Sequence, residues 1–197
     1  MSRAITQAFI LIVFLGIATP TTWADIQSIQ LGNVKYSGSA CPAGSVTTFI
    51  EPATAQIHIH FNQYIVEAHG RNQGLRKTCQ LSIPIKVPNG VSISLVSAEY
   101  NGKVALPTGG QARIMNAYSF SGRRGMRFKT EFQGPSTQGY SLHDPLSSFA
   151  SVWSPCGQDT VLRVTTSTRI KTRTSNHRAY ADSQQGFVTQ LRYRSCQ

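Results

Sequence analysis

Apolar and polar residues alternate with a period of two along much of this chain. Between residues 57 and 62, isoleucine and phenylalanine alternate with histidine and asparagine, and a similar alternation runs from 81 to 87. Period two is typical of a half-buried strand, and no apolar stripe with helical spacing persists for ten residues. The pattern predicts strands and little helix. Further predicted strands are 34–36, 46–50, 91–100, 112–120, 127–132, 152–153, 161–173 and 188–193.

Turn residues separate these runs. Asn89-Gly90 and Asn101-Gly102 each lie between apolar runs, and Asn-Gly favours the tight turn of a β-hairpin. We therefore predict hairpins at both places, and an edge strand or bulge at Pro84. Flexible loops are expected at 71–77, 121–125, 134–139 and 174–186. Many short strands with frequent turns indicate an all-β fold, a single antiparallel β-sandwich or jelly-roll-like domain with little helix.

The first 24 residues have the composition of a secretory signal. Arg3 precedes an uncharged apolar run from 8 to 18, and Thr22-Trp23-Ala24 resembles a cleavage site. The run is shorter than the ~20 residues that a membrane span needs. We expect residues 1–24 to be a cleaved signal peptide, residues 25–197 to form one domain without a transmembrane segment, and the protein to be secreted or periplasmic.

Cysteine usage agrees with an exported protein. The four cysteines are Cys41, Cys79, Cys156 and Cys196, and an even number in an exported chain indicates two disulfides. Three pairings are possible. We predict the pairs that are neighbours in sequence, Cys41–Cys79 and Cys156–Cys196. No C-x-x-C occurs, which disfavours a zinc ribbon or a thioredoxin-like redox site.

Positive charge is the most unusual feature of the composition. The chain has 19 Lys and Arg against 8 Asp and Glu, a formal net charge of +11. On the predicted strand 161–173, the basic residues share one parity, and the apolar residues Leu162, Val164 and Ile170 take the other, so the basic side chains should share one face. The candidate binding residues are Arg163, Arg169, Lys171 and Arg173, with Arg123, Arg124 and Arg127 as a second group. Such a surface attracts anionic polysaccharide, lipopolysaccharide or other polyanions, although general solubility also explains it. Nucleic acid is not favoured because no recognised binding motif accompanies the charge.

Enzymatic and metal chemistry have weaker support. His58 and His60 would point to the same side of a strand and could share a metal ion, with His69 as a third ligand, but no H-E-x-x-H accompanies them. No G-x-S-x-G or S-x-x-K occurs, and disulfides leave no free thiol. We predict no cofactor and no catalytic residues. Trp153, beside Cys156, is expected to pack in the core. The tyrosines considered for a sugar-binding platform are Tyr100, Tyr118, Tyr140 and Tyr180.

Several segments, in order, resemble the secreted family called domain of unknown function 4360. They are residues 34–45 (VKYSGSACPAGS), 76–81 (RKTCQL), 87–90 (VPNG), 118–122 (YSFSG), 153–157 (WSPCG) and the terminal Cys196. The resemblance spans nearly the whole chain after residue 24. It implies secretion, a β-rich fold and two disulfides, and it supplies no catalytic or binding residues.

The sequence thus favours a secreted, non-enzymatic protein that binds an anionic glycan or another envelope polyanion. Two alternatives remain. One is an unrecognised hydrolase or metal-dependent enzyme that uses His58 and His60. The other is a stable structural or inhibitor-like secreted domain.

Overall fold

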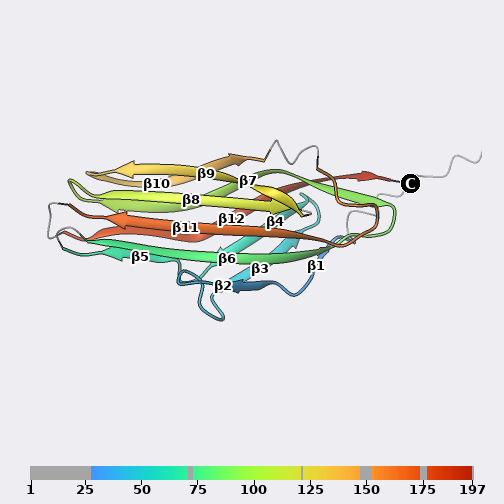
Figure 1. Ribbon diagram of the computed structural model, residues 1–197, viewed down its shortest axis with the longest axis horizontal. Helices are drawn as coiled ribbons and strands as arrows, with labels where there is room; N and C mark the ends of the chain where they lie inside the picture. Colours follow the sequence, from blue (N-terminus) through green and yellow to red (C-terminus); the bar gives the residue numbers. More distant parts are fainter. Residues whose placement is uncertain (1–27, 71–72, 121, 147–151, 174–176, 197) are drawn as a thin grey trace, which may run out of the picture.

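The computed structural model describes residues 28–70, 73–120, 122–146, 152–173 and 177–196. Within these ranges the chain forms strands and no helix, and none of it could therefore cross a membrane as a helix. Long strands run side by side along the long axis of the molecule (Figure 1). The strands are β1 (Gln30–Leu31), β2 (Lys35–Ser37), β3 (Val46–Glu51), β4 (Gln56–Phe61), β5 (Ile65–Ala68), β6 (Gly74–Lys86), β7 (Val91–Leu106), β8 (Gln111–Phe120), β9 (Arg123–Gln133), β10 (Ser136–Pro145), β11 (Thr160–Lys171) and β12 (Ala179–Ser195).

The strands form two antiparallel sheets. Sheet A has the order β1-β6-β11-β8-β9, with β2 also paired to β6, and sheet B has the order β10-β7-β12-β4-β3, with β5 also paired to β12. From β5 onward the chain changes sheet at every connection except the one between β8 and β9, which form a hairpin within sheet A. Two four-stranded arrays, β6-β11-β8-β9 and β4-β12-β7-β10, therefore face each other in the order of a jelly roll. This confirms the predicted fold class.

The core lies between the two sheets and follows the alternation in the sequence. Ile57, Ile59 and Phe61 of β4 are buried, and so are the even-numbered Leu162, Val164 and Ile170 of β11. Aromatic rings fill the centre. Phe187 of β12 stacks on Tyr100 at a centroid distance of 4.2 Å and meets the edge of Tyr118. Burial of these side chains supplies the main stabilisation. It also leaves the alternate position of each strand pointing to the outside.

The two predicted hairpins are wrong. Asn89-Gly90 does form a tight turn, closed by the Val91 amide donating to the Pro88 carbonyl at 3.2 Å, but it joins β6 in sheet A to β7 in sheet B. Asn101-Gly102 lies inside β7. A Cβ at Gly102 would collide with the Tyr140 side chain and the Asp182 carbonyl. Close packing, and not a turn, therefore requires the glycine there.

Other strand assignments also differ. The predicted strand at 152–153 is irregular, whereas the predicted loops at 71–77, 134–139 and 174–186 contribute residues to β6, β10 and β12. β10 has the sequence STQGYSLHDP, which contains few apolar residues and so lacks a strong strand signal. Pro84 accepts a hydrogen bond from the Gly32 amide at the break between β1 and β2, so it lies at an interrupted edge, consistent with the prediction.

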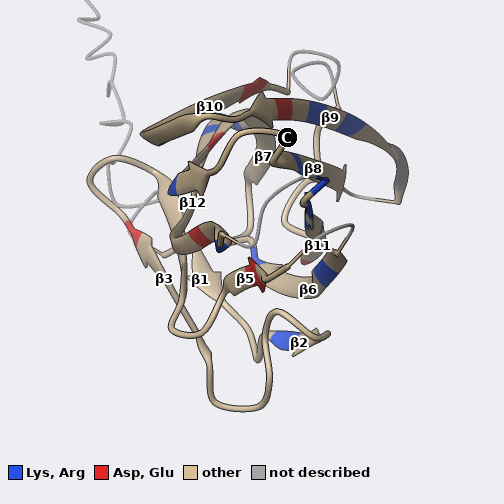
Figure 2. Cartoon of the chain, turned by 90° about the vertical axis from the view of Figure 1, so that its left-hand side faces the viewer, with Lys and Arg blue, Asp and Glu red and all other residues tan. Residues whose placement is uncertain are grey.

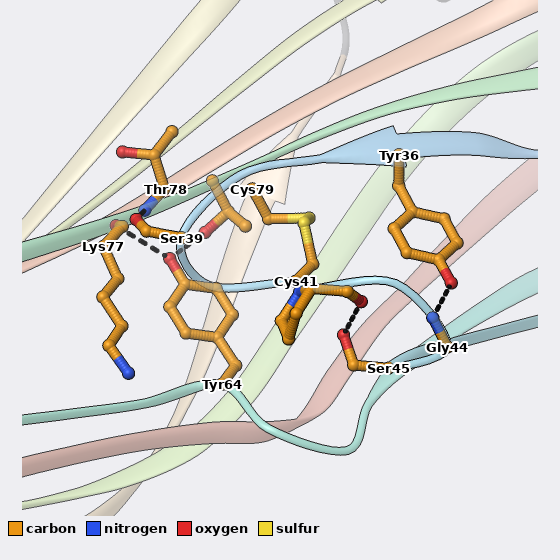
Figure 3. Close-up of a disulfide and its surroundings, with 11 residues drawn as sticks. Tyr36, Ser39, Cys41, Gly44, Ser45, Tyr64, Lys77, Thr78 and Cys79 are labelled. Atoms are coloured by element: carbon orange, nitrogen blue, oxygen red, sulfur yellow. Dashed lines mark hydrogen bonds between the residues drawn. A yellow bond between two sulfur atoms is a disulfide. The ribbon is translucent and has the colours of Figure 1, made fainter.

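Both predicted disulfides are present, Cys41–Cys79 and Cys156–Cys196. The first attaches the segment after β2 to β6 (Figure 3). Nearby, the Thr78 amide donates to the Ser39 hydroxyl at 3.1 Å, and the Gly44 amide donates to the Tyr36 hydroxyl at 2.8 Å. The second attaches the end of β12 to the segment before β11. Each sheet is therefore braced by one disulfide.

Candidate functional site

Outward positions on sheet A are rich in cations. On β11 the odd-numbered residues point outward. The residues paired with them, which are the even-numbered residues of β6 and the odd-numbered residues of β8 and β9, lie on the same outer face of sheet A. The exposed cations of this surface, which we name the basic face, are Lys35, Arg76, Lys86, Arg113, Arg127, Lys129, Arg163, Arg169 and Lys171. Figure 2 shows Lys and Arg positions on β6, β8, β9, β11 and β2, and others on β12.

Three arginines of the basic face lie in one row across the sheet. Arg169 of β11 is directly opposite Arg76 of β6 on one side and Arg113 of β8 on the other. Glu131 of β9 ends the row opposite Arg113. Because neighbouring strands lie ~4.8 Å apart, the three arginine backbones fall within ~10 Å. Like charges at this spacing repel, so the row favours an anion above it.

Glu131 is the one carboxylate on the basic face within the described chain, and it is already engaged. Its Oε1 accepts from Arg113 Nε at 2.6 Å and lies 3.5 Å from Lys129 Nζ. The hydrogen bond from Arg113, and the charges of Arg113 and Lys129, lower the pKa of Glu131 below its ordinary value. Among the described residues, no carboxylate lies within ion-pair distance of Arg169 or Lys171.

The basic face is hollowed at two places. A groove of about 210 Å³ lies between β11, β8 and β9, and a smaller hollow of about 60 Å³ adjoins it. Arg113 and Arg169 line both, so we name this depression the arginine groove. Its other charged lining residues are Lys171, Arg76 and the carboxylate Glu131. A separate depression of about 390 Å³, the Lys35–Arg163 hollow, lies over β2, β6 and β11.

The structure brings together part of the predicted basic group. Arg163, Arg169 and Lys171 share the outward side of β11, and Arg127 joins them from β9. Arg173 is exposed just beyond the end of β11. Arg123 and Arg124 begin β9, but their side chains lie outside what the structure describes.

Sequence reasoning missed Arg76, Arg113 and Lys35. Arg76 fell in a predicted loop. Arg113 had a usable signal, because it alternates with the apolar Ala112 and Ile114 in a predicted strand. Their convergence on Arg169 depends on the pairing of strands that are distant in sequence.

The three histidines proposed as metal ligands do not lie together. His58 and His60 lie on the outward side of β4, with ring centroids 6.4 Å apart, and Phe49 stacks on His58 at 4.6 Å. His58 Nε2 lies 3.5 Å from Glu51. His69 directly follows β5. Because β4 and β5 pair with different parts of β12, His69 lies roughly 30 Å from His58 along the direction of that strand. Among the described residues, no group of three or more potential metal ligands occurs.

The predicted tyrosine platform is wrong for three of its four residues. Tyr100, Tyr118 and Tyr140 are buried between the sheets. Tyr140 and Ser183 share a hydrogen bond of 2.8 Å, and burial raises the pKa of all three tyrosines. Tyr180 is half-buried beside Arg178.

Trp153 is half-buried, with the guanidinium groups of Arg194 and Arg192 at 4.3 and 4.8 Å from its ring. It therefore supports β12 near the Cys156–Cys196 disulfide and presents no bare platform.

Asp144 and His143 do not form a catalytic pair. They are adjacent in β10, so they point to opposite sides of sheet B. Asp144 is buried and accepts hydrogen bonds from Tyr118 at 2.7 Å and from Asn116 at 3.0 Å, which links β10 to β8 of the other sheet. Burial raises the pKa of Asp144. The carboxyl group is a structural link between the two sheets.

The fold and its surface define a disulfide-braced jelly-roll protein with one strongly basic outer face. The chain belongs to the family described as "Domain of unknown function (DUF4360)", whose model matches residues 27–196. It is 29% identical over 180 residues to an uncharacterized secreted protein of Arthroderma benhamiae, covering 87% of this chain and 74% of that protein. This relative and the two disulfides place the protein outside the cytoplasm.

Among solved structures, the chain is similar to that of TmCBM61 in complex with β-1,4-galactotriose, at 12% sequence identity and a TM-score of 0.29. The match covers 83% of this chain and 88% of the other.

Proposed function

We propose that the protein is a secreted, non-enzymatic binding protein whose basic face holds an anionic polysaccharide. The observation that carries this proposal is the row of Arg76, Arg169 and Arg113, in which the central arginine has no carboxylate partner in the described chain. A guanidinium group presents paired donors that match sulfate, phosphate or carboxylate oxygens. An anionic polymer would relieve the repulsion within this row.

The chemistry between the cations favours a polysaccharide over nucleic acid. Proteins that hold single-stranded nucleic acid stack bases on aromatic side chains. On the basic face, the described outward positions of β6, β8, β9 and β11 carry no aromatic residue, and the two aromatic residues in the walls of the hollows, Tyr36 and Phe132, are half-buried. The outward positions carry amide and hydroxyl groups, including Thr78, Gln80 and Thr165, which can exchange hydrogen bonds with sugar hydroxyls.

Retention on heparin-coated and lipopolysaccharide-coated resins tests the proposal. The test variant replaces Arg163, Arg169, Lys171 and Arg173 by Gln. The control removes the same charge from sheet B and its neighbourhood by replacing Lys103, Arg178, Arg192 and Arg194. We expect the test variant to elute at clearly lower salt and the control to elute close to the wild type.

Equal elution of both variants would contradict a specific basic face and indicate net charge alone. Elution of the wild type at or below physiological salt would remove the proposal. Thermal unfolding of each variant checks that the fold is intact. Metal analysis of the purified protein tests the alternative enzyme built on His58 and His60.

A further inference from the structure

Resting on the proposed function, we infer that the basic face has two separate anion subsites, which a single linear polysaccharide must bridge. The arginine groove is one subsite, and the Lys35–Arg163 hollow is the other. The ligand is then a polymer with repeated negative charges, and a short fragment bearing one or two charges occupies only one subsite.

The spacing follows from the strand itself. Arg169 and Arg163 both point outward from β11 and are six residues apart. At ~3.4 Å per residue in an antiparallel sheet, their backbones are ~20 Å apart. Screening at physiological ionic strength acts over about 8 Å. The two subsites therefore bind small anions independently, and only a ligand long enough to reach both can couple them.

Between Arg169 and Arg163, the outward positions along β6 and β11 are polar and uncharged. The accessible side chains there are Thr78, Gln80 and Thr165, of which Gln80 and Thr165 line the Lys35–Arg163 hollow. Ser167 is buried and already accepts a hydrogen bond from Arg76. The three accessible side chains offer hydrogen bonds and no charge, which suits the hydroxyl-rich stretch of a sugar chain between two anionic groups.

Each subsite has its own arrangement of charge. In the arginine groove, Glu131 holds the Nε of Arg113, and Ser167 Oγ accepts from Arg76 Nε at 2.7 Å. These contacts fix the two outer arginines of the row and leave Arg169 and Lys171 to meet an incoming anion. In the Lys35–Arg163 hollow, the two cations lie on either side of Ser82, so an anion between them would be held from both sides.

Size-fractionated heparin fragments test the inference with the folded protein at physiological ionic strength. Fragments longer than ~20 Å should bind on the order of 100-fold more tightly than fragments that fill one subsite, because the second contact becomes intramolecular. The variant Arg169→Gln/Lys171→Gln and the variant Lys35→Gln/Arg163→Gln should each lose this dependence on length. The control Lys103→Gln/Arg178→Gln removes the same charge and should keep it.

The outcomes separate the inference from the proposed function. Tight binding of long fragments with the same length dependence in all variants would overturn the two-subsite arrangement and leave polysaccharide binding intact. Absence of heparin binding at every length would overturn both. If single-stranded DNA of matched length and charge binds as tightly as heparin, the assignment of a polysaccharide ligand is overturned.

Discussion

The two outer faces of this sandwich are built by the same alternation of residues and yet differ in charge. On sheet B and its borders, carboxylates have basic neighbours: Glu67 pairs with Arg178, Asp182 with Lys103, and Glu51 lies near His58. On sheet A, cations outnumber the single described carboxylate, Glu131. Inward residues determine the fold on both sides, so the outward residues can differ in charge without changing it. Among the described residues, most of the cations without a carboxylate partner therefore lie on the basic face, where an external anion can meet them.

The largest expected effect comes from the disulfides, because each one braces one face. Replacing Cys41 and Cys79 by Ser should cost about 2–5 kcal/mol in the free energy of unfolding, as should replacing Cys156 and Cys196. Only the first variant should also weaken heparin binding by the folded protein, because it releases the segment next to Lys35. Urea unfolding and heparin titration measure the two effects. Equal loss of binding in both variants would contradict the assignment of one disulfide to each face.

The buried link between the sheets gives the next effect. Tyr118→Phe removes a hydrogen bond to the buried Asp144 carboxylate and should cost about 1.5–3 kcal/mol at neutral pH. Because burial raises the pKa of Asp144, the folded protein takes up this proton at a higher pH than the unfolded chain does. The protonation of Asp144 therefore stabilises the folded protein increasingly as the pH falls from the folded pKa toward the unfolded pKa. This contribution is lost as the pH rises through the folded pKa.

Once Asp144 is protonated, the cost of Tyr118→Phe should shrink, since the hydrogen bond no longer involves a charge. Urea unfolding at several pH values measures the change. Asp144→Asn is the control and should remove the pH dependence that this group causes. A cost that is constant with pH would mean that Asp144 is not the group that titrates.

Charge reversal at one position compares the faces directly. Arg169→Glu should weaken heparin binding by about 10-fold, which is ~1.4 kcal/mol, whereas Lys103→Glu on sheet B should have little effect. The difference should diminish as salt is added, because exposed charges are screened. Surface plasmon resonance at several salt concentrations measures both. Similar losses at the two positions would show that the faces do not differ in function.

The smallest effect concerns the one acidic group on the basic face. Glu131→Gln should raise heparin affinity by roughly 2–3-fold and leave the free energy of unfolding almost unchanged, because the ion pair with Arg113 is exposed. The pKa of Glu131 is lowered from 4.5, so this carboxylate stays mostly charged at pH 4.5. Acidification to that pH should therefore not have the same effect as the substitution. A loss of affinity would instead mean that Glu131 orients Arg113 for the ligand.

The sequence predicted the parts of this structure that depend on local alternation. On β11 it placed Leu162, Val164 and Ile170 inward and Arg163, Arg169 and Lys171 outward, and it favoured the correct cysteine pairs. It failed where distant contacts decide. Gly102 looked like a turn because the Tyr140 side chain that crowds it is 38 residues away in sequence, and the arginine row depends on strand register that no local pattern encodes.

β9 lies at the end of sheet A, so one side of its backbone has no neighbouring strand within that sheet. An open strand edge invites a second molecule to add its own strand, which is a common start of aggregation. Arg127 and Lys129 stand along this edge, and the same edge of another copy would carry the same charges. Edge-to-edge stacking of identical molecules is therefore disfavoured, which suits a protein that must stay dispersed without cytoplasmic chaperones.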